Sequence, residues 1–535
     1  MRLAHATLYG RLLASDPIYD GRFFFAVRST GVYCLPSCRA RKPKPENVRF
    51  FPTCDAARAA GFRACKKCHP DDYARGADPV LETIETVVAE LRADPARFPD
   101  AAALVRRSGY GATRAHELFR RHFHATPAEL IAAARLAAAR AKLLSTSGPV
   151  AEVAFSVGYE SLSTFNDAFR TRTGLTPAAT RALRSLSPSP SLKPALPADC
   201  VTQAVTQSES SFSLPPPALA RETARSPGLR NPKGYAFRSP ATSSSVTLAL
   251  PPDYPLERLL AQLGRDPQSI SEHLDGLVYH AATRIDGRAF RLAVDFSRAT
   301  SDHTATLTLP DDLSPALRAE TAARVARLLG LAQDAAGFAR LAKKLGLARL
   351  VAGRESLRIP QYLTPWDALL WAILGQQINL PFAFRLRRAL TELAGEPVGD
   401  GLVAPPSPVA VAALPPASLA ARQFSRQKIR TLLDTARLVT SGALDLEKLA
   451  AGSATRAERA LLDVHGLGPW TVNYVLMRGF GFADCTPYGD TGLTGGLQTL
   501  FALDRRPDVD ATRRLMLPFS PHRSLATAHL WQLKA

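Results

Sequence analysis

The chain has 535 residues, in which 67 Lys and Arg outnumber 47 Asp and Glu and give a formal net charge of +20. That length predicts several domains, and so basic a charge favours an anionic polymer, DNA or RNA, as the partner. No apolar run is long enough to span a bilayer, and the first residues lack the apolar core of a signal peptide. Seven cysteines, an odd number, do not suit a secreted disulfide framework. We therefore expect a cytoplasmic protein without a membrane partner.

The N-terminal part, residues 1–76, holds the most specific pattern in the chain. Short apolar and aromatic runs, broken by Gly, Pro and Cys, predict a small α+β domain there. Cys34 and Cys38 are separated by three residues, and Cys65 and Cys68 by two. Such pairs chelate Zn²⁺ from turns, and four thiolates complete its tetrahedron. The spacing predicts a zinc site and leaves open whether the metal only holds the domain together or also activates one thiolate.

The residues around these cysteines carry a family resemblance. FFFAVRSTGVYCLPSCRARKPKPENVRFF (residues 23–51) and AAGFRACKKC (residues 59–68) closely resemble the N-terminal domain of Ada-type adaptive-response regulators. In that family the first cysteine, here Cys34, is both a zinc ligand and the acceptor of a methyl group from a DNA phosphotriester. The resemblance implies an irreversible, stoichiometric transfer that turns a thiolate into a thioether, which lowers the negative charge of the site and raises its affinity for DNA. Nearby cations are candidates for phosphate contacts: Arg39, Arg41, Lys66 and Lys67.

Residues 78–182 are rich in Ala, Leu and Arg and have helical periodicity. Two helix–turn–helix patterns, Ala101–Phe123 and Pro149–Arg172, flank a long amphipathic helix, Pro127–Leu144. The string VAEVAFSVGYESLSTFNDAFRTRTGLTPAATR, which starts at Val150, resembles AraC-type DNA-binding domains. That resemblance implies recognition of promoter DNA in the major groove and, for an activator, contact with RNA polymerase. The second motif offers three side chains for base edges: Ser161, Thr164 and Asn166.

Residues 183–245 form a linker by composition. The strings SPSPSLKPALPADC and SESSFSLPPP are rich in Pro and Ser and lack periodicity. Cys200 lies in this stretch and has no evident partner in the sequence. A linker of this length predicts loose coupling between the two halves of the chain.

Periodic segments return in residues 246–318. The strings VTLAL, LVYHAATRI, FRLAVDF and ATLTL alternate between apolar and polar positions. They predict half-buried strands of an antiparallel sheet, with one helix over Leu256–Leu263. This stretch is therefore expected to be an α+β domain.

A tight turn marks the C-terminal part, residues 319–535, which is otherwise mostly helical between Gly and Pro breaks. Val464–Trp470 fits a helix–hairpin–helix, because Gly466 and Gly468 permit a hairpin whose backbone N–H groups face a phosphate. Asp490 follows a short distance beyond, after a loop that contains Gly and Pro. This arrangement resembles the helix–hairpin–helix glycosylases, with Asp490 at the place of their catalytic aspartate.

Together with the sheet region before it, the whole of residues 246–535 resembles alkyl-base DNA glycosylases of the AlkA type. The resemblance implies that an alkylated base leaves the stack, and that Asp490 stabilises the positive charge developing on the sugar and orients or deprotonates water. Gln376 and Gln377, in the string ILGQQI, align with the loop that fills the gap left by the flipped base. A cationic base favours an electron-rich pocket, for which three aromatic residues are candidates: Trp470, Tyr474 and Trp531.

Two departures from the resemblance bear on activity. Relatives that also cleave the strand have a lysine where this chain has Trp470, so we expect base excision without β-lyase activity. Thr491 and Gln262 replace aromatic residues of the AlkA-type pocket. They support an alternative, a transcription regulator whose glycosylase half is degenerate and only binds DNA. The retained Asp490 and the retained aromatic residues argue against that alternative.

These patterns predict a multidomain, mainly α-helical protein. It comprises a small zinc-bound α+β domain, a double helix–turn–helix module, an antiparallel-sheet α+β domain and an all-α helix–hairpin–helix domain. The expected domain and linker ranges are 1–76, 78–182, 183–245, 246–318 and 319–535. We expect a monomer that binds double-stranded DNA at promoter sites, methylphosphotriesters and alkylated bases. Cys34 would serve transcription activation, and the glycosylase would be a monofunctional hydrolase of the DNA-3-methyladenine glycosylase II type.

Overall fold

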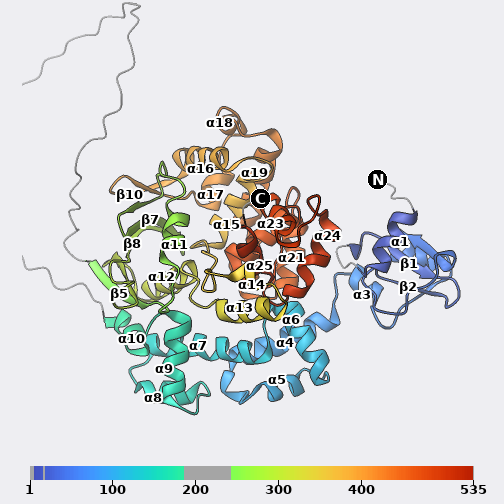
Figure 1. Cartoon of the computed structure of the whole chain (residues 1–535), viewed down its shortest axis with the longest axis horizontal. Coiled ribbons are helices and arrows are strands. Elements are labelled where there is room, and N and C mark those ends of the chain that lie inside the picture. Colours follow the sequence, from blue (N-terminus) through green and yellow to red (C-terminus); the bar gives the residue numbers. More distant parts are fainter. Residues whose placement is uncertain (1–4, 16–18, 186–242, 534–535) are drawn as a thin grey trace, which may run out of the picture.

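Helices make up about half of the described residues and outnumber the strands, which confirms the multidomain, mainly helical fold class expected from the sequence (Figure 1). The computed structural model describes residues 5–15, 19–185 and 243–533. The Pro/Ser-rich linker lies almost wholly outside the described residues, and so does Cys200. Within the described ranges, no helix is both long and apolar enough to cross a membrane.

The N-terminal domain is a four-stranded sheet flanked by short helices. Its strands have the order β3-β1-β2-β4, in which β1 pairs antiparallel with β2 and β3, while β4 joins β2 in parallel. Apolar side chains form two small cores, and the four cysteines gather at one of them. The elements are α1 (His5–Leu13), β1 (Phe24–Val27), β2 (Val32–Cys34), β3 (Val48–Phe51), α2 (Cys54–Ala59), β4 (Arg63–Ala64) and α3 (Pro70–Ala74).

Seven helices follow, and they contain both helix–turn–helix motifs expected from the sequence. The first motif consists of α5 and α6, the second of α8 and α9, and α7 joins them. The N-terminus of α7 is fixed by a capping box, in which Thr126 and Glu129 each accept a backbone N–H of the other. The helices are α4 (Pro79–Ala93), α5 (Ala101–Arg107), α6 (Ala112–Phe123), α7 (Pro127–Ser145), α8 (Val150–Ser156), α9 (Leu162–Thr173) and α10 (Pro177–Ser185).

The next domain is a five-stranded antiparallel sheet with the order β5-β9-β8-β7-β6. Its side chains alternate between buried and half-buried positions along β8 and β9, as the sequence pattern predicts. The helix α12 (Pro315–Leu328) packs its apolar residues into the same core. The domain boundary expected between residues 318 and 319 falls inside α12, whose apolar residues pack with the sheet. The other elements are β5 (Ser243–Ala249), α11 (Leu256–Leu263), β6 (Glu272–Asp275), β7 (Val278–Ile285), β8 (Arg288–Asp295) and β9 (Thr304–Pro310).

The C-terminal helical domain is built around α15 (Pro365–Leu374), in which every residue except Asp367 is buried. The domain is not all α, contrary to expectation. β10 (Glu396–Gly399) and β11 (Leu402–Ala404) form an antiparallel hairpin, and Val403 donates its backbone N–H to the carbonyl of Ile270 in the sheet domain. The other helices of the domain are α13 (Ala335–Lys344), α14 (Ala348–Val351), α16 (Leu380–Ala394), α17 (Pro408–Ala412), α18 (Pro416–Ala420), α19 (Arg426–Thr440), α20 (Leu446–Ala451), α21 (Ala454–Leu462), α22 (Pro469–Val475), α23 (Thr491–Phe501), α24 (Val509–Met516) and α25 (Arg523–Leu530).

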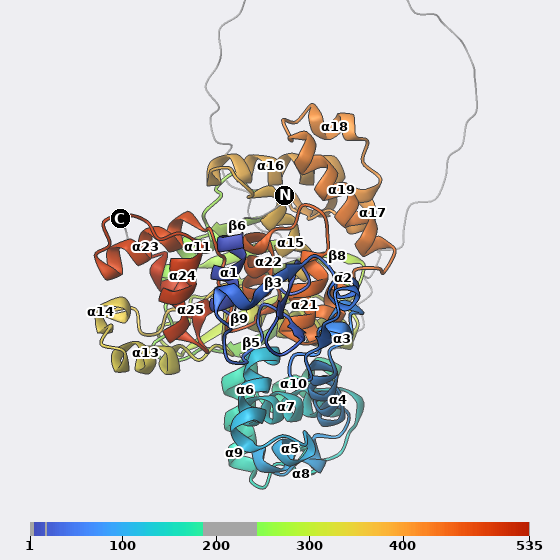
Figure 2. The same cartoon turned by 90° about the vertical axis from the view of Figure 1, so that its right-hand side faces the viewer.

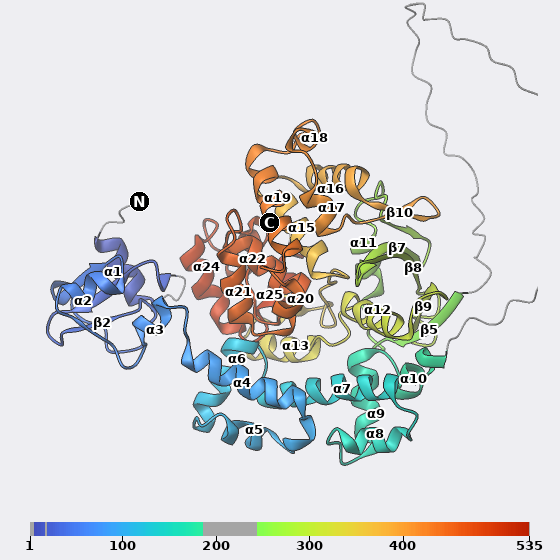
Figure 3. The same cartoon turned by 180° about the vertical axis from the view of Figure 1, so that it is seen from behind.

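The helix–turn–helix region packs along the C-terminal half, so the loose coupling expected from the linker is wrong for the described residues (Figure 3). Phe165 and Phe169 of α9 share one apolar core with strand residues such as Leu248. The carbonyl of Gly174 accepts the backbone N–H of Ala249 at 2.6 Å. The composition of a linker does not show whether the domains that it connects have apolar surfaces that pack together, and here they do.

The N-terminal end of the helix–turn–helix region, α4 and the residue after α6, also contacts the C-terminal half, mainly through polar groups on α21. Arg456 donates its Nε–H to the Glu85 carboxylate of α4 at 2.9 Å, and Arg459 pairs with Asp78 at 2.9 Å. His124, just after α6, accepts the backbone N–H of Asp484 at 3.3 Å. Since α21 leads directly into the Val464–Trp470 hairpin, the helix–turn–helix region supports the helix on which that hairpin is mounted.

The N-terminal domain is attached differently, by ion pairs at its surface, and projects from the larger body (Figure 1), so that it lies in front of that body in the view of Figure 2. Arg39 pairs with Glu117 on α6, and Arg11 pairs with Asp510 on α24. The Arg459 guanidinium lies 5.1 Å from the ring centroid of Tyr73. Exposed ion pairs contribute little free energy, so this attachment is weaker than the shared core described above.

Candidate functional site

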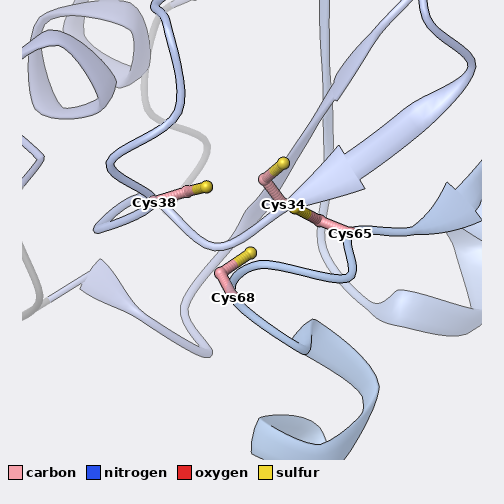
Figure 4. Close-up of side chains that lie close together, drawn as sticks. All are labelled: Cys34, Cys38, Cys65 and Cys68. Carbon is pink, nitrogen blue, oxygen red and sulfur yellow. The ribbon is translucent and has the colours of Figure 1, made fainter. Parts of the chain in front are cut away.

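Four cysteine sulfurs converge in the N-terminal domain, from the end of one strand and from two turns (Figure 4). Cys34 is the last residue of β2, Cys38 lies in the turn after it, and Cys65 and Cys68 lie between β4 and α3. The four sulfur atoms all lie within 4.8 Å of one another. Cys68 is half-buried, and the other three are buried. The structure therefore brings together the four ligands that the spacing suggested.

The donor set and its geometry fit a zinc ion. Zn–S bonds of about 2.3 Å place the sulfurs of a tetrahedral site about 3.8 Å apart, within the observed limit. The pKa of Cys34 is raised, chiefly by hydrogen bonding to Cys38 and Cys68 and to a smaller extent by burial. The pKa of Cys38 is lowered by hydrogen bonding to Cys34 and Cys68. Thiols packed this closely cannot all ionise alone, and a divalent cation removes that obstacle.

Backbone groups orient the cluster. The N–H of Leu35 points to the sulfur of Cys68 at 3.4 Å, and the N–H of Lys67 points to the sulfur of Cys65 at 3.4 Å. The turn that carries Cys38 is held by Asp20, which accepts the backbone N–H of Ser37 at 3.0 Å and its hydroxyl at 2.6 Å. Such contacts hold ligands in place before a metal binds.

The cations near the cluster do not play one common role. Arg41, Lys66 and Lys67 are exposed, while the Arg39 guanidinium is engaged by Glu117. Lys42, which the sequence did not single out, donates its ammonium to the carbonyl of Cys38 at 2.7 Å. Burial lowers the pKa of Lys42. In a string of alternating basic residues and prolines, only the tertiary contacts distinguish Lys42 from its neighbours.

The second helix–turn–helix presents Thr164 and Asn166 as exposed residues of α9. Ser161 differs from them, because it is the N-cap of α9 and accepts the backbone N–H of Thr164 at 3.4 Å. A capping serine stabilises the start of a helix. The three residues expected to face base edges are therefore two helix-face residues and one cap.

A cleft of about 1630 Å³ lies where the sheet domain meets the helical domain. It is lined from many separate parts of the chain, among them α11, the segment from α15 to α16, the start of α19, the hairpin with α22, and the segments around Asp490 and Trp531. Gln262 and Thr491 also line it. All five cleft residues singled out for the base or the flipped-base gap are among its walls: Gln376, Gln377, Trp470, Tyr474 and Trp531.

Asp490 is held in this cleft by three neutral N–H donors. Its side chain caps α23 by accepting the backbone N–H of Leu493 at 2.8 Å. The indole N–H of Trp531 donates to the same oxygen, Oδ1, at 2.9 Å, and the indole N–H of Trp470 donates to Oδ2 at 2.9 Å. Neutral donors fix a carboxylate without cancelling its charge. The arrangement supplies an oriented anion at the wall of an enclosed space.

The aromatic residues form a contiguous group beside this carboxylate. The rings of Trp470 and Tyr474 are stacked with centroids 5.4 Å apart, and Trp531 lies 6.5 Å from Tyr474. The Tyr474 hydroxyl accepts a guanidinium N–H of Arg478 at 3.1 Å. Arg478 also lies 5.2 Å from the ring centroid of Tyr362. Sequence reasoning missed this buried cation behind the aromatic group, because nothing in the MRGFGF string marks it.

The hairpin depends on Gly466 more than on Gly468. Gly466 has φ +90°, and a Cβ there would lie 2.1 Å from Oγ1 of Thr431. Gly468 has φ −91° and is the N-cap of α22, and a Cβ there meets nothing within 4 Å. Only Gly466 therefore needs to be glycine for local packing.

The two glutamines, expected to act alike, differ in their contacts. Gln376 donates its amide N–H groups to the carbonyl of Gly466 and to Oγ1 of Thr471, both at 2.9 Å. Gln377 is exposed and has φ +56°. Gln376 thus attaches its loop to the hairpin, whereas Gln377 is exposed at the wall of the cleft.

Comparison with known proteins finds matches to three separate parts of the chain. Three family models match: "Metal binding domain of Ada" at residues 7–71, "Helix-turn-helix domain" at 104–183, and "HhH-GPD superfamily base excision DNA repair protein" at 370–521. The combination defines a DNA-binding repair protein with an Ada-type metal-binding domain, and the Ada match together with the four-cysteine cluster identifies Zn²⁺ as its cofactor.

Three curated relatives are similar to the chain. The "probable bifunctional transcriptional activator/DNA repair enzyme AlkA" of Mycobacterium tuberculosis is 29% identical over 538 residues, which cover 98% of this chain and 95% of the relative. The bifunctional transcriptional activator/DNA repair enzyme AdaA of Bacillus subtilis is 31% identical over 33% of this chain and 82% of its own length. The DNA-3-methyladenine glycosylase of Bacillus subtilis is 36% identical over 31% of this chain and 56% of its own length. The chain belongs to the family of the bifunctional transcriptional activator/DNA repair enzymes.

Proposed function

We propose that this protein excises alkylated bases from double-stranded DNA at the cleft, and that it accepts a methyl group from DNA phosphotriesters on Cys34. One observation carries the first activity: the Asp490 carboxylate is held by the indoles of Trp470 and Trp531 at the wall of a cleft large enough for a base. The match to the metal-binding domain of Ada, the four-cysteine cluster and the relatives named as transcriptional activators and DNA repair enzymes support the second activity.

The chemistry of excision follows from the charge of Asp490. The C1′–N bond breaks, and its electron pair leaves with the base, so that a cationic alkylated base becomes neutral. The sugar acquires oxocarbenium character, which the carboxylate stabilises. A water then forms the C1′–O bond, and its proton passes to the carboxylate or to solvent. The stacked rings of Trp470 and Tyr474 offer a π-surface that favours the cationic base.

The substitution Asp490→Asn tests this mechanism. The amide oxygen can still cap α23, so the fold survives, while the negative charge at C1′ is lost. We expect the single-turnover release of 3-methyladenine to fall by about 100-fold or more. Wild-type release by the variant would show that Asp490 is only a helix cap. Release by the wild-type chain also separates an active glycosylase from the alternative of a degenerate half that only binds DNA.

We further propose that the glycosylase is a monofunctional hydrolase of the DNA-3-methyladenine glycosylase II type. β-Lyase chemistry needs a free amine to attack the sugar. Among the described residues that line the cleft, Lys428 is the single lysine, and its ammonium donates to three backbone carbonyls. Borohydride should therefore trap no covalent complex with DNA from which the base has been excised, and a trapped complex would contradict the proposal.

For the N-terminal domain we propose methyl transfer with Cys34 as nucleophile. The S–C bond forms as the C–O bond of the phosphotriester breaks, and the diester oxygen leaves with the electron pair. Zinc, when bound by Cys34, Cys38, Cys65 and Cys68, keeps the acceptor sulfur ionised at neutral pH. Arg41, Lys66 and Lys67 are exposed and close in sequence to the cysteines, so their charges can hold the phosphates next to the methylated one. Mass spectrometry after incubation with methylated DNA should find one added methyl on the Cys34 peptide, and an unmodified peptide would contradict the assignment.

We also propose that the helix–turn–helix region binds promoter sites through Thr164 and Asn166 and that it recruits RNA polymerase. The protein would act as a monomer in the cytoplasm. The exposure of both side chains on α9 supports this. Asn166→Ala should weaken binding to a selected promoter sequence by about 1 to 3 kcal/mol and leave non-specific binding unchanged. An equal loss on all sequences would contradict a base contact. The domain ranges given from the sequence remain part of this proposal, with the whole of α12 assigned to the sheet domain.

A further inference from the structure

Lys428 is a buried lysine at the edge of the cleft that the proposed chemistry does not use. It is the third residue of α19, and only 7% of its surface is exposed. Its ammonium donates to the carbonyls of Ile373 at 3.1 Å, Leu374 at 3.0 Å and Gln376 at 2.9 Å. All three N–H donors are thus directed at one short stretch of backbone.

That stretch is the C-terminal end of α15 and the loop after it. The last carbonyls of a helix lack partners within the helix and carry the negative end of its dipole. A cation with three rotatable donors satisfies both requirements at once. Burial lowers the pKa of Lys428 to about 8, so the ammonium keeps all three N–H groups near neutral pH.

The loop fixed in this way runs into two residues with different roles in the cleft. Gln376 binds the carbonyl of Gly466 in the hairpin and the hydroxyl of Thr471 in α22. Gln377 follows with φ +56°, a left-handed conformation that costs free energy for a non-glycine residue and persists only where its surroundings hold it. The carbonyl of Gln376, which Lys428 holds, is part of the peptide unit that leads into Gln377.

The helix α19 supports the hairpin as well as the loop. One turn after Lys428, Thr431 packs against Gly466, where a Cβ would lie 2.1 Å from its hydroxyl oxygen. The loop and the hairpin are therefore both mounted on the first turns of α19 and are linked to each other through Gln376. Trp470, whose indole binds Asp490, lies next to the same loop, since a Cβ at Gly375 would lie 3.8 Å from its ring.

We propose that Lys428 is a positioning residue for base excision: it holds the 373–377 loop in the conformation that presents Gln377 to the gap left in the DNA. This inference rests on the proposed glycosylase activity. A purely structural role would affect the stability of α15 alone. A positioning role predicts, in addition, a loss that depends on Gln377 and that appears only on DNA with a missing or flipped base.

A double-mutant cycle on the full chain tests the proposal. Lys428→Met removes the ammonium and keeps an unbranched apolar stem, and Gln377→Asn shortens the side chain at a residue type that tolerates the left-handed conformation. The readouts are single-turnover release of 3-methyladenine, and affinity for a duplex with a tetrahydrofuran abasic site and for an undamaged duplex. The matched control is Lys344→Met, which removes an exposed lysine on α13 that is not part of the cleft wall.

We expect Lys428→Met to lower both excision and affinity for the abasic duplex by about tenfold or more, because small misplacements in a site cost that much. Affinity for undamaged DNA and the behaviour of Lys344→Met should not change. The double variant should lose no more excision and affinity than the more impaired of the two single variants, because both substitutions act through one loop. Multiplying losses would overturn the proposal, as would wild-type values for Lys428→Met.

Failure of the glycosylase and failure of the Lys428→Met variant to fold can each be told apart from failure of the positioning role. If the wild-type chain releases no base, the proposed glycosylase fails, and the abasic-duplex affinities alone then decide the role of Lys428. If Lys428→Met does not fold at the assay temperature, Lys428→Gln is measured with the same expectations, since its amide keeps two donors without the charge. A variant that melts earlier but excises and binds at wild-type levels at a permissive temperature would leave Lys428 with a structural role only.

Discussion

The cysteine cluster and the cleft are built in opposite ways. The cluster takes its four ligands from residues 34–68, within one small domain whose cores are slight. The cleft takes its functional groups from residues 376–531, across a domain with one large apolar core. In a small domain whose site comes from one short segment, the fold of the domain depends on each metal ligand. A site assembled from many segments inherits its geometry from a core that does not need the functional residues.

The largest effect that this comparison predicts is loss of zinc and fold from one cysteine. Cys65→Ser removes a ligand that is buried in the smaller domain. Zinc contributes on the order of 10 kcal/mol to the folding of small domains that bind it, so residues 1–76 should unfold and lose the metal. Metal analysis and limited proteolysis measure both. Base excision at the cleft should stay at its wild-type rate, and a parallel loss of excision would break the comparison.

The Val464–Trp470 hairpin offers the corresponding test in the cleft. Gly466→Ala introduces a side chain at φ +90° and against Oγ1 of Thr431. Backbone strain of this kind costs about 2 kcal/mol, and chemical denaturation of the full chain should show that loss for the C-terminal half. Gly468→Ala is the matched control, because its Cβ would meet nothing within 4 Å. Equal losses for the two variants would contradict the packing argument.

An effect of similar size, but on the rate of excision and not on stability, is expected from the indoles that hold Asp490. Trp531→Phe keeps an aromatic ring but removes the N–H that donates to Oδ1 at 2.9 Å. A hydrogen bond to a charged group is worth about 1.5 to 3 kcal/mol, so excision should fall by about tenfold or more, with little change in thermal unfolding. The outcome that would count against an oriented carboxylate is an unchanged rate in both Trp531→Phe and Trp470→Phe.

The smallest effect concerns pH and the contact between α6 and the helical domain. Burial lowers the pKa of His124 to about 4, from an ordinary value of 6.5, and the neutral ring accepts the N–H of Asp484. Since the unfolded chain binds a proton here at higher pH than the folded chain does, stability is present above pH 6.5 and is lost as pH falls toward 4. Asp484 favours the charged ring and Arg523 opposes it, and Asp484 stays ionised through this range because its pKa is about 2.

The substitution His124→Asn isolates that contribution. Asn tolerates the φ of +54° at this position and does not titrate. Thermal unfolding at pH 7 and pH 5 should therefore show a smaller difference for His124→Asn than for the wild-type chain. His116→Asn, on the exposed side of the same helix, is the control and should behave like the wild type. The prediction is wrong if both asparagine variants lose the same part of the pH dependence.

Much of the fold could be read from local patterns. The helix Leu256–Leu263 lies where the sequence predicts it, and the turns of both helix–turn–helix motifs follow from glycines and capping residues. The domain boundary in α12 and the hairpin of β10 and β11 could not be read, because both depend on which surface a segment packs against. The shared core of α9 and the sheet was hidden for the same reason, since the linker between them carries no information on docking.

By itself, the sequence determined the cysteine set, the two helix–turn–helix motifs and the hairpin followed by Asp490, because each is a pattern of residue types at short spacing. Tertiary structure decided how these groups act. It placed the indoles of Trp470 and Trp531 on the two oxygens of Asp490, and it separated Gln376, bound to the hairpin, from the exposed Gln377. It also brought the ammonium of Lys428 to the end of α15. Contacts between segments far apart in the chain arise from packing of the whole core, and no local spacing records them.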